Sequence, residues 1–500
     1  MEQKGKFEPY GVTQSAYKRL TEPADSNTED HFYWLSQINK ASLVINSSEG
    51  LLDTKYVKEF AQGLKKVIKN GNQGGPRPQK VIDFEPYWIK ESGPEVSRIH
   101  AGRSSQDMLT TASMAVLRRA LLDLDKEIHA VEEELMNMAD RYKTAVMPAY
   151  TNGVAAQPTS YAHYLLAFVD AFRRDNERLR QFYDRVNQCA MGSTVLNGTG
   201  WPLNRQRMSD YLGFARPFEN CFDATQIFTD ECSAETAGLC TVIAIHTGNF
   251  VADVMLQYSQ PRPWILLQEG GANTYVSSAM PQKRNPGILN NLRTKASTIL
   301  GEATGAVYRT HNIATGFADP RGLDLTMIVW ETEDLMKMML RVLQALVFNE
   351  ERALEELNLD WTASQEIADR LMREYNVPFR IGHHVASDIV GYARAHDIRP
   401  LDFPHEIAER IYLDNVAALN LSEVPEHFPL DEAEFRATLD PKAIIARRAV
   451  SGGPQPEEVQ RMYEENRKSL EADELWRLNQ EDALATAKKE LEAKFTALLK

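Results

Sequence analysis

The sequence predicts an all-α protein built as a bundle of long helices. The first observation behind this fold class is the spacing of apolar residues at steps of three and four over many helical turns. The second is the scarcity of alternating β-branched runs, which would predict strands. The chain has 500 residues, which is enough for several domains or for one elongated helical architecture.

Two helices are predicted in the N-terminal part of the chain. The first runs from about residue 30 to a break at residues 47–48, and the second covers about 53–68. The stretch 81–93 lacks a clear period and is expected to be irregular. These elements and a polar leading segment make up a predicted N-terminal helical domain, residues 1–109.

The strongest periodic signal begins near Thr110, and neither Pro nor Gly interrupts it before Pro148. Its apolar positions repeat at steps of four and three: Leu117, Leu121, Leu124, Ile128, Val131, Leu135 and Met138. Such a seam is typical of a long helix packed against others. At 1.5 Å per residue this helix would be roughly 40–45 Å long, and we interpret it as scaffold.

Further long helices are predicted at about 160–188 and 230–259, after Gly287, and at about 323–346. Their apolar spacing again has the period of a helix. With the preceding helix they form a predicted central long-helix bundle domain, residues 110–360.

The composition changes near Asp360, after which shorter helical patterns alternate with Pro-bearing turns. Pro interrupts helices, so this change predicts a smaller C-terminal helical domain, residues 361–500. The end of the chain is rich in Glu, Ala, Lys and Leu and predicts one amphipathic helix.

Composition excludes several classes of function. The net charge of −14 argues against a nucleic-acid partner, which would need a basic surface. An anionic substrate must therefore be attracted by local cations. We expect no stretch apolar enough to span a bilayer, and the N-terminus lacks the apolar segment of a signal peptide.

The four cysteines show neither CxxC spacing nor neighbouring histidine pairs. A metal site or a disulfide framework is therefore not expected, and a reducing compartment fits better. We expect a soluble cytoplasmic protein without a metal or cofactor.

Three polar loops interrupt the helical pattern: HAGRSSQD at 100–107, PAYTNG at 148–153 and EGGANTYVSSAMPQKRNPG at 269–287. Loops that lead into helix starts are suited to holding anions. For the third loop, which leads into a helical pattern up to Arg293, an ordinary surface connection with turn residues is the alternative when it is taken alone. In an antiparallel bundle, such loops could meet at one end or between subunits.

Taken together, the loops resemble the fumarase/aspartase superfamily and, within it, the argininosuccinate lyases. The segment SSAMPQKRNP is similar to the superfamily signature, and HAGRSSQD is similar to HTGRSRND. PAYTNGVAAQP stands where the family has PGYTHLQxAQP. The similarity continues through NVPFRIGHHVASDIVGYA and RRAVSGGPQPEEV, so it covers most of the chain.

This resemblance implies an all-α homotetramer with a central bundle of twenty helices and four active sites, each built from three subunits. It implies cleavage of a C–N or C–O bond β to a carboxylate, with release of fumarate. Removing the weakly acidic proton beside that carboxylate creates a doubly charged aci-carboxylate. The site must therefore provide a strong base and fixed donors to the developing charge.

By the same resemblance Ser277 is the base, and Lys283 is the cation that lowers its pKa in a closed, dry loop. The residues expected to bind substrate are Arg103, Ser104, Ser105, Thr151, Asn285, Phe317 and Arg321. For Arg103, a salt bridge within the scaffold is an equally good alternative.

The chain departs from the family on the leaving-group side. Asn152 stands where the family has its general-acid histidine, and Asn290 stands where that histidine has its carboxylate partner. An amide cannot deliver a proton near neutral pH. The segment from Phe317 to Arg321 lacks the groups that hold the guanidinium of argininosuccinate, and Ser105 replaces an arginine.

Two hypotheses follow from these departures. The protein is not an argininosuccinate lyase, and its leaving group needs no strong acid or receives its proton elsewhere. Relay candidates are Ser104, Ser105, Tyr150 or a water, with His163 a weaker one. We favour a lyase acting on a succinyl-type N-substituted aspartate. The alternatives are a cycloisomerase or other addition–elimination enzyme, argininosuccinate lyase itself, and a non-catalytic structural protein.

Overall fold

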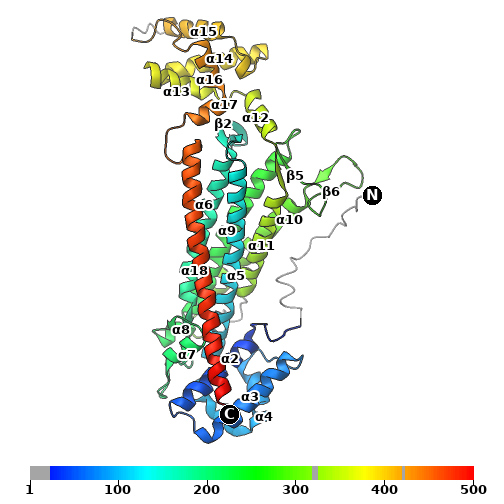
Figure 1. The fold of residues 1–500 in the computed structure, drawn as a ribbon, viewed down its shortest axis with the longest axis vertical. Coiled ribbons are helices and arrows are strands. Elements are labelled where there is room, and N and C mark those ends of the chain that lie inside the picture. Colours follow the sequence, from blue (N-terminus) through cyan, green and yellow to red (C-terminus); the bar gives the residue numbers. More distant parts are fainter. Residues whose placement is uncertain (1–22, 318–324, 419–422) are drawn as a thin grey trace.

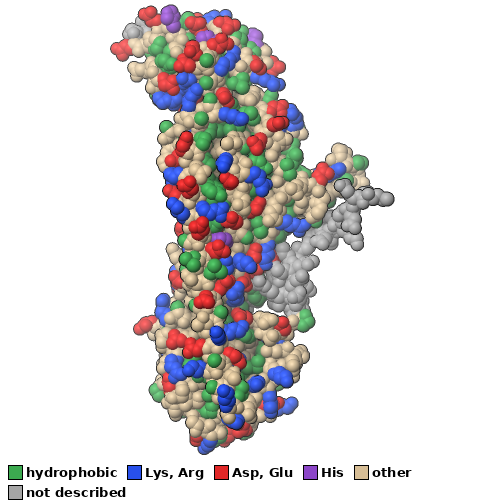
Figure 2. Space-filling model, viewed as in Figure 1, with side chains coloured by type: hydrophobic (Ala, Val, Ile, Leu, Met, Phe, Trp, Pro, Cys, Tyr) green, Lys and Arg blue, Asp and Glu red, His purple; other side chains and the backbone are tan. Residues whose placement is uncertain are grey.

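The computed structural model describes residues 23–317, 325–418 and 423–500. It confirms the predicted all-α class, with long helices running side by side along one axis (Figure 1). Smaller helices lie at both ends of the bundle, the N-terminal ones at one end and those after residue 360 at the other. On the face in Figure 2, acidic and basic side chains of described residues alternate instead of gathering into a basic stripe.

The N-terminal part contains more helix than expected. Its elements are α2 (His31–Ser48), α3 (Thr54–Asn72), α4 (Val81–Ser92) and the 3₁₀ helix η1 (Pro94–His100).

The expectation that 81–93 is irregular was wrong. Val81, Phe84 and Trp88 are buried along one face of α4, and the Trp88 Nε1 donates a hydrogen bond to the Phe60 carbonyl at 3.0 Å. Pro86 inside the helix hid this periodicity, although tertiary packing overrides its cost.

Helix α5 (Ser105–Arg141) is the predicted scaffold helix, and its 37 residues make it longer than expected. At 1.5 Å per residue it extends about 55 Å. Asp107 and Ser104 form a capping box at its start. The predicted seam is buried throughout, from Leu117 to Met138.

Four further long helices confirm the expected ranges closely: α6 (Tyr161–Val186), α9 (Phe228–Tyr258), α10 (Gly287–Thr310) and α11 (Leu325–Ala345). Helix α5 packs against α6 and α11, and α9 packs against α10. Two short helices, α7 (Arg205–Tyr211) and α8 (Cys221–Gln226), lie between α6 and α9 in the sequence.

Helix α9 corrects the expectation about membrane segments. By length and composition it could cross a membrane, although it packs against α10, α6 and α11 in the bundle. Only 44% of its most apolar window is buried within the chain.

Short strands supplement the helices. The pairs are β1 (Val146–Thr151) with β2 (Val154–Ser160), β3 (Gln188–Cys189) with β4 (Arg216–Pro217), β5 (Ile265–Leu267) with β8 (Leu346–Phe348), and β6 (Tyr275–Val276) with β7 (Arg284–Asn285). All are antiparallel except the β3–β4 pair.

The region after the bundle consists of two parts. Short helices form a separate core around Trp361, Ile389 and Phe435. The elements of this region are α12 (Glu350–Leu359), α13 (Ser364–Tyr375), α14 (Phe379–His396), η3 (Pro400–Asp402), α15 (His405–Ala418), α16 (Glu432–Leu439) and α17 (Pro441–Ala446). The last helix, α18 (Pro456–Ala497), instead runs back along α5 and α6 to reach α2. The three-domain division stays a prediction.

All four cysteines are free, and Cys189, Cys232 and Cys240 are buried. Within the described ranges, no group of three or more His, Cys, Asp or Glu side chains is placed to hold a metal ion.

A buried carboxyl on α5 is expected to make stability depend on pH. Burial raises the pKa of Asp125 to about 7, against the opposing effect of Arg180 and Arg477. The carboxyl lies 3.6 Å from the Arg477 Nε on α18. Because the folded pKa lies above the ordinary value of 3.8, the stability linked to the neutral carboxyl is complete at low pH and is lost as the pH rises through about 7.

Asp125→Asn is therefore expected to stabilise the protein at pH 8 by up to about 4 kcal/mol and to change little at pH 4. Urea unfolding at the two pH values measures the difference. Asp140→Asn, at an exposed position on the same helix, is the control. A loss of stability at pH 8 in Asp125→Asn would mean that its charge stabilises the fold.

Candidate active site

The first loop is held rigidly at the start of α5. Asp107 Oδ1 accepts the Ser104 N–H at 2.8 Å, and its Oδ2 accepts the N–H groups of Gly192 and Thr194 at 3.0 and 3.2 Å. Burial raises the pKa of Asp107 to about 6, while these N–H groups oppose the shift. The carboxylate is thus ionised at neutral pH and ties a second loop, residues 192–194, to the first.

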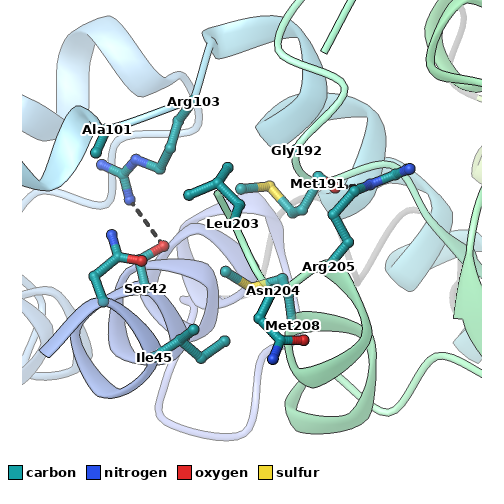
Figure 3. Close-up of a pocket in the computed structure, with 11 residues that line it drawn as sticks. Ser42, Ile45, Ala101, Arg103, Met191, Gly192, Leu203, Asn204, Arg205 and Met208 are labelled. Carbon is teal, nitrogen blue, oxygen red and sulfur yellow. Dashed lines mark hydrogen bonds between the residues drawn. The ribbon is translucent and has the colours of Figure 1, made fainter. Parts of the chain in front are cut away.

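Arg103 points into the N-terminal part of the chain. Its Nη1 donates to Asn39 Oδ1 at 2.7 Å. The same Nη1 donates to Ser42 Oγ at 3.3 Å (Figure 3). Burial lowers the pKa of Arg103 to about 10, so the group stays cationic at neutral pH. These contacts favour the scaffold alternative, although through neutral partners and not through the expected salt bridge.

The cavity beside Arg103, between Ser42, Leu203 and Met208, has a volume of about 20 Å³. That is room for about one water. The cavity is thus too small for a dicarboxylate. On the outer side of the loop, Ser105 is exposed and Ser104 is partly exposed.

The second loop is the turn of the β1–β2 hairpin. Asn152 and Gly153 both have positive φ, 52° and 76°. Two residues with positive φ between antiparallel strands are the mark of a type I′ turn, which the Asn-Gly pair favours. This pair was the signal for the hairpin that the sequence analysis missed. Thr151 and Asn152 are exposed at its tip.

Tyr150 anchors this hairpin to the bundle. Its hydroxyl accepts hydrogen bonds from Gln257 Nε2 at 3.0 Å and from Trp264 Nε1 at 3.3 Å. Gln257 lies in the last turn of α9, so the hairpin stands at the C-terminal end of that helix.

Both ring nitrogens of His163 make hydrogen bonds within the fold. Its Nδ1 pairs with the Thr159 hydroxyl at 3.1 Å, and its Nε2 pairs with the Gly452 carbonyl at 3.0 Å. A carbonyl can only accept, so Nε2 carries a proton and donates it. The ring thereby joins strand β2 to the turn before α18, which favours the packed role over proton relay.

The third loop is a flap that stands out from the bundle, with β6 and β7 at its base (Figure 1). Ser277 lies just after β6, and its Oγ accepts the N–H groups of Ala279 and Met280 at 3.3 and 3.2 Å. Two N–H donors aimed at a hydroxyl oxygen stabilise negative charge on it. Lys283 lies across the flap, where its carbonyl accepts the Ser277 N–H at 3.2 Å, and its side chain is exposed.

Arg284 holds the flap in place. Its Nε donates to Glu269 Oε2 at 2.9 Å and its Nη1 to the Pro281 carbonyl at 2.7 Å. The Tyr258 hydroxyl, at the end of α9, donates to the Arg284 carbonyl at 3.1 Å. The flap therefore lies at the same end of α9 as the hairpin.

The remaining predicted residues lie around these loops. Asn285 Nδ2 donates to the Tyr275 carbonyl at 3.2 Å within the flap. Asn290 is partly buried in the first turn of α10, and its N–H donates to the Pro286 carbonyl at 3.1 Å. Phe317 is exposed after α10, and Arg321 lies outside the described residues.

The predicted site residues fall into two groups within one chain. The first loop contacts Thr194. The carbonyl of the following residue, Val195, accepts a hydrogen bond from Gln226, which lies just before α9, so the first loop is tied to the N-terminal end of that helix. The flap and the hairpin are tied to the other end of α9. The 31 residues of α9 separate the groups by about 46 Å. A site that uses both groups therefore needs more than one copy of the chain.

Comparisons with known proteins agree with this architecture. Residues 35–301 match a family described as lyase. The chain is 30% identical to an argininosuccinate lyase of Methanosarcina acetivorans, over 92% of this chain and 91% of that protein. It is 29% identical to an argininosuccinate lyase of Methanoculleus marisnigri, over 90% of each.

Solved structures show the same fold. An EDDS lyase variant with bound fumarate superposes with a TM-score of 0.87 at 23% identity, covering 99% of this chain and 96% of that one. A 3-carboxy-cis,cis-muconate lactonizing enzyme from Pseudomonas putida superposes with a TM-score of 0.65 at 16% identity, covering 91% and 97%. At these identities the similarity shows the fold alone.

Proposed function

The chain belongs to the fumarase/aspartase superfamily of lyases, and we propose that it is a carbon–nitrogen lyase that releases fumarate from an N-substituted aspartate. Its relatives at 29 and 30% identity are named argininosuccinate lyases. The leaving-group side of this chain departs from the family pattern at Asn152 and Asn290, so the amine is proposed to be other than arginine.

The arrangement around Ser277 carries this proposal. The Ser277 Oγ, stabilised as an alkoxide by the N–H groups of Ala279 and Met280, takes the proton next to the substrate carboxylate. The electron pair first forms the aci-carboxylate and then the C=C bond. The C–N bond breaks with its electron pair going to the nitrogen, which enters the reaction as an ammonium and therefore leaves as a neutral amine. Lys283 is proposed to approach the charge when the flap closes, with Asn285 as a further donor.

The other predicted residues would bind the two carboxylates and the amine. Ser104, Ser105 and Thr151 are proposed carboxylate donors, and Asn152 and Asn290 are proposed to face the leaving amine. Arg103 would support the first loop from behind, as its bonds to Asn39 and Ser42 indicate.

We further propose that the protein is a homotetramer whose sites each combine loops of three copies. Two observations support assembly: the loops stand at opposite ends of α9, and the apolar surface of α9 is only partly covered within one chain. A cytoplasmic location and turnover without a cofactor complete the proposal.

The direct test measures fumarate absorbance with a panel of N-substituted aspartates that includes argininosuccinate. We expect fumarate from at least one N-substituted aspartate and none from argininosuccinate. Efficient cleavage of argininosuccinate would refute the altered amine side. Absence of fumarate from the whole panel would favour the second candidate, a cycloisomerase or other addition–elimination enzyme, for which Asn152 and Asn290 also suffice because no leaving-group acid is needed.

Asn152→His tests whether the hairpin tip faces the leaving group. Histidine is among the residues that accept a positive φ, so the turn should keep its shape. We expect a new ionisation near pH 6.5 in the profile of kcat/KM, because a histidine facing the amine can donate a proton. An unchanged rate and profile would place Asn152 away from the leaving group.

A further inference from the structure

A strained turn at Thr194 lies between the first loop and the segment that follows α10. Thr194 has a φ of 58°. This left-handed conformation is rare for a β-branched residue and is therefore strained. Such strain persists only where surrounding contacts impose it, and it concentrates at functional sites.

The contacts that impose the conformation are specific. The Thr194 N–H donates to Asp107 Oδ2 at 3.2 Å, and its hydroxyl donates to the Gly102 carbonyl at 3.3 Å. The next carbonyl, that of Val195, accepts from Gln226 Nε2 at 3.1 Å and from the Thr225 hydroxyl. Both residues are thus fixed through groups other than the Val195 side chain.

The same turn connects the first loop to Phe317. A Cβ atom on Gly316 would lie 3.8 Å from Gln226 Oε1, so the residue before Phe317 approaches the side chain that holds Val195. The first loop, the strained turn and Phe317 are therefore neighbours in one chain, although the sequence separates them widely.

The exposed side chains along this path are apolar. Val195 is 43% exposed, Ile227 is 46% exposed and Phe317 is 61% exposed. The carboxylate of Asp107, which contacts the turn, is buried and accepts hydrogen bonds from three N–H groups. An exposed apolar set beside a proposed carboxylate-binding loop is suited to the uncharged part of a substrate.

We propose that Val195, carried on the strained turn, forms with Phe317 an apolar wall for the amine substituent, so that this lyase takes aspartates whose nitrogen bears an uncharged, apolar group. The inference rests on the proposed function and names the substrate class for it. The occupant is the substrate, because the wall adjoins Ser104 and Ser105 through Asp107 and Gly102.

The test compares kcat/KM for aspartates that carry butyl or benzyl (apolar), guanidinobutyl (cationic) or carboxymethyl (anionic) groups on nitrogen. The wild-type protein is expected to prefer the apolar group by about tenfold or more, the range that one hydrophobic pocket provides. Val195→Lys is expected to reduce the ratio of apolar to anionic substrates at least about tenfold, and the nearly isosteric Val195→Thr a few-fold. Ile82→Lys, at a β-branched exposed position on α4, should leave the ratio unchanged.

The outcomes separate this inference from the function on which it rests. If fumarate forms but the charged substrates are preferred, or if Val195→Lys leaves the ratio unchanged, the apolar wall is refuted and the lyase activity stands. Dissociation of the assembly by Val195→Lys, seen by size-exclusion chromatography, would assign the surface to a second copy and also overturn the proposal. If no N-substituted aspartate yields fumarate, the proposed function fails and the inference fails with it.

Discussion

Ser277→Ala is expected to abolish fumarate release, with kcat reduced by roughly 10²–10⁴-fold, the usual contribution of a positioned base. The loss follows from geometry, since the Ser277 Oγ is the atom to which the N–H groups of Ala279 and Met280 point. Alanine leaves these two donors without an oxygen to stabilise and leaves no group to take the proton.

The neighbouring serine provides a matched control. Ser278 is exposed on the same flap, so Ser278→Ala removes an identical hydroxyl one residue away. It should retain activity within a few-fold. Size-exclusion chromatography and circular dichroism should show the same assembly and helix content for both variants. Full activity in Ser277→Ala would refute the assignment of the base and mean that another group takes the proton.

The long helices could be predicted from the sequence because their cores repeat with the period of a helix. Leu117, Leu121 and Leu124 are all fully buried on α5. Prediction failed where local signals compete. Pro86 concealed α4, and the turn at Asn152 and Gly153 was read only as part of a loop.

The candidate site could be predicted only as separate pieces. The flap residues stand close together in the sequence, so one segment that resembles the family signature predicts Ser277 and Lys283 together. The roles of Asp107, Thr194 and Val195 depend on contacts between segments that are far apart in the sequence. No local pattern reports such contacts, and the strain at Thr194 is invisible without backbone angles. The same limit applies to α9. Its length and apolar composition would also fit a membrane span, and only its packing partners show that it is a bundle helix.

Two inactive variants are expected to restore one another if the site combines copies of the chain. Ser105→Asp places a carboxylate in the exposed first turn of α5, where a helix favours negative charge, so the fold should tolerate it. The same charge repels a dicarboxylate substrate. At about 4 Å this repulsion is worth about 4 kcal/mol at a surface dielectric, which is roughly a 10³-fold loss.

Hybrid assemblies of Ser105→Asp and Ser277→Ala copies should nevertheless regain roughly a quarter of wild-type activity. When the two kinds of copy mix at random in a symmetric assembly, about one site in four combines an intact first loop with an intact flap. Co-expression with two affinity tags yields the hybrids, and fumarate release measures them. Ser277→Ala mixed with Lys283→Met is the control: both changes lie on one flap, so no site regains an intact copy. Recovery only in the first mixture would follow from the separation of the loops along α9, whereas no recovery in either would place both loops of a site in one chain.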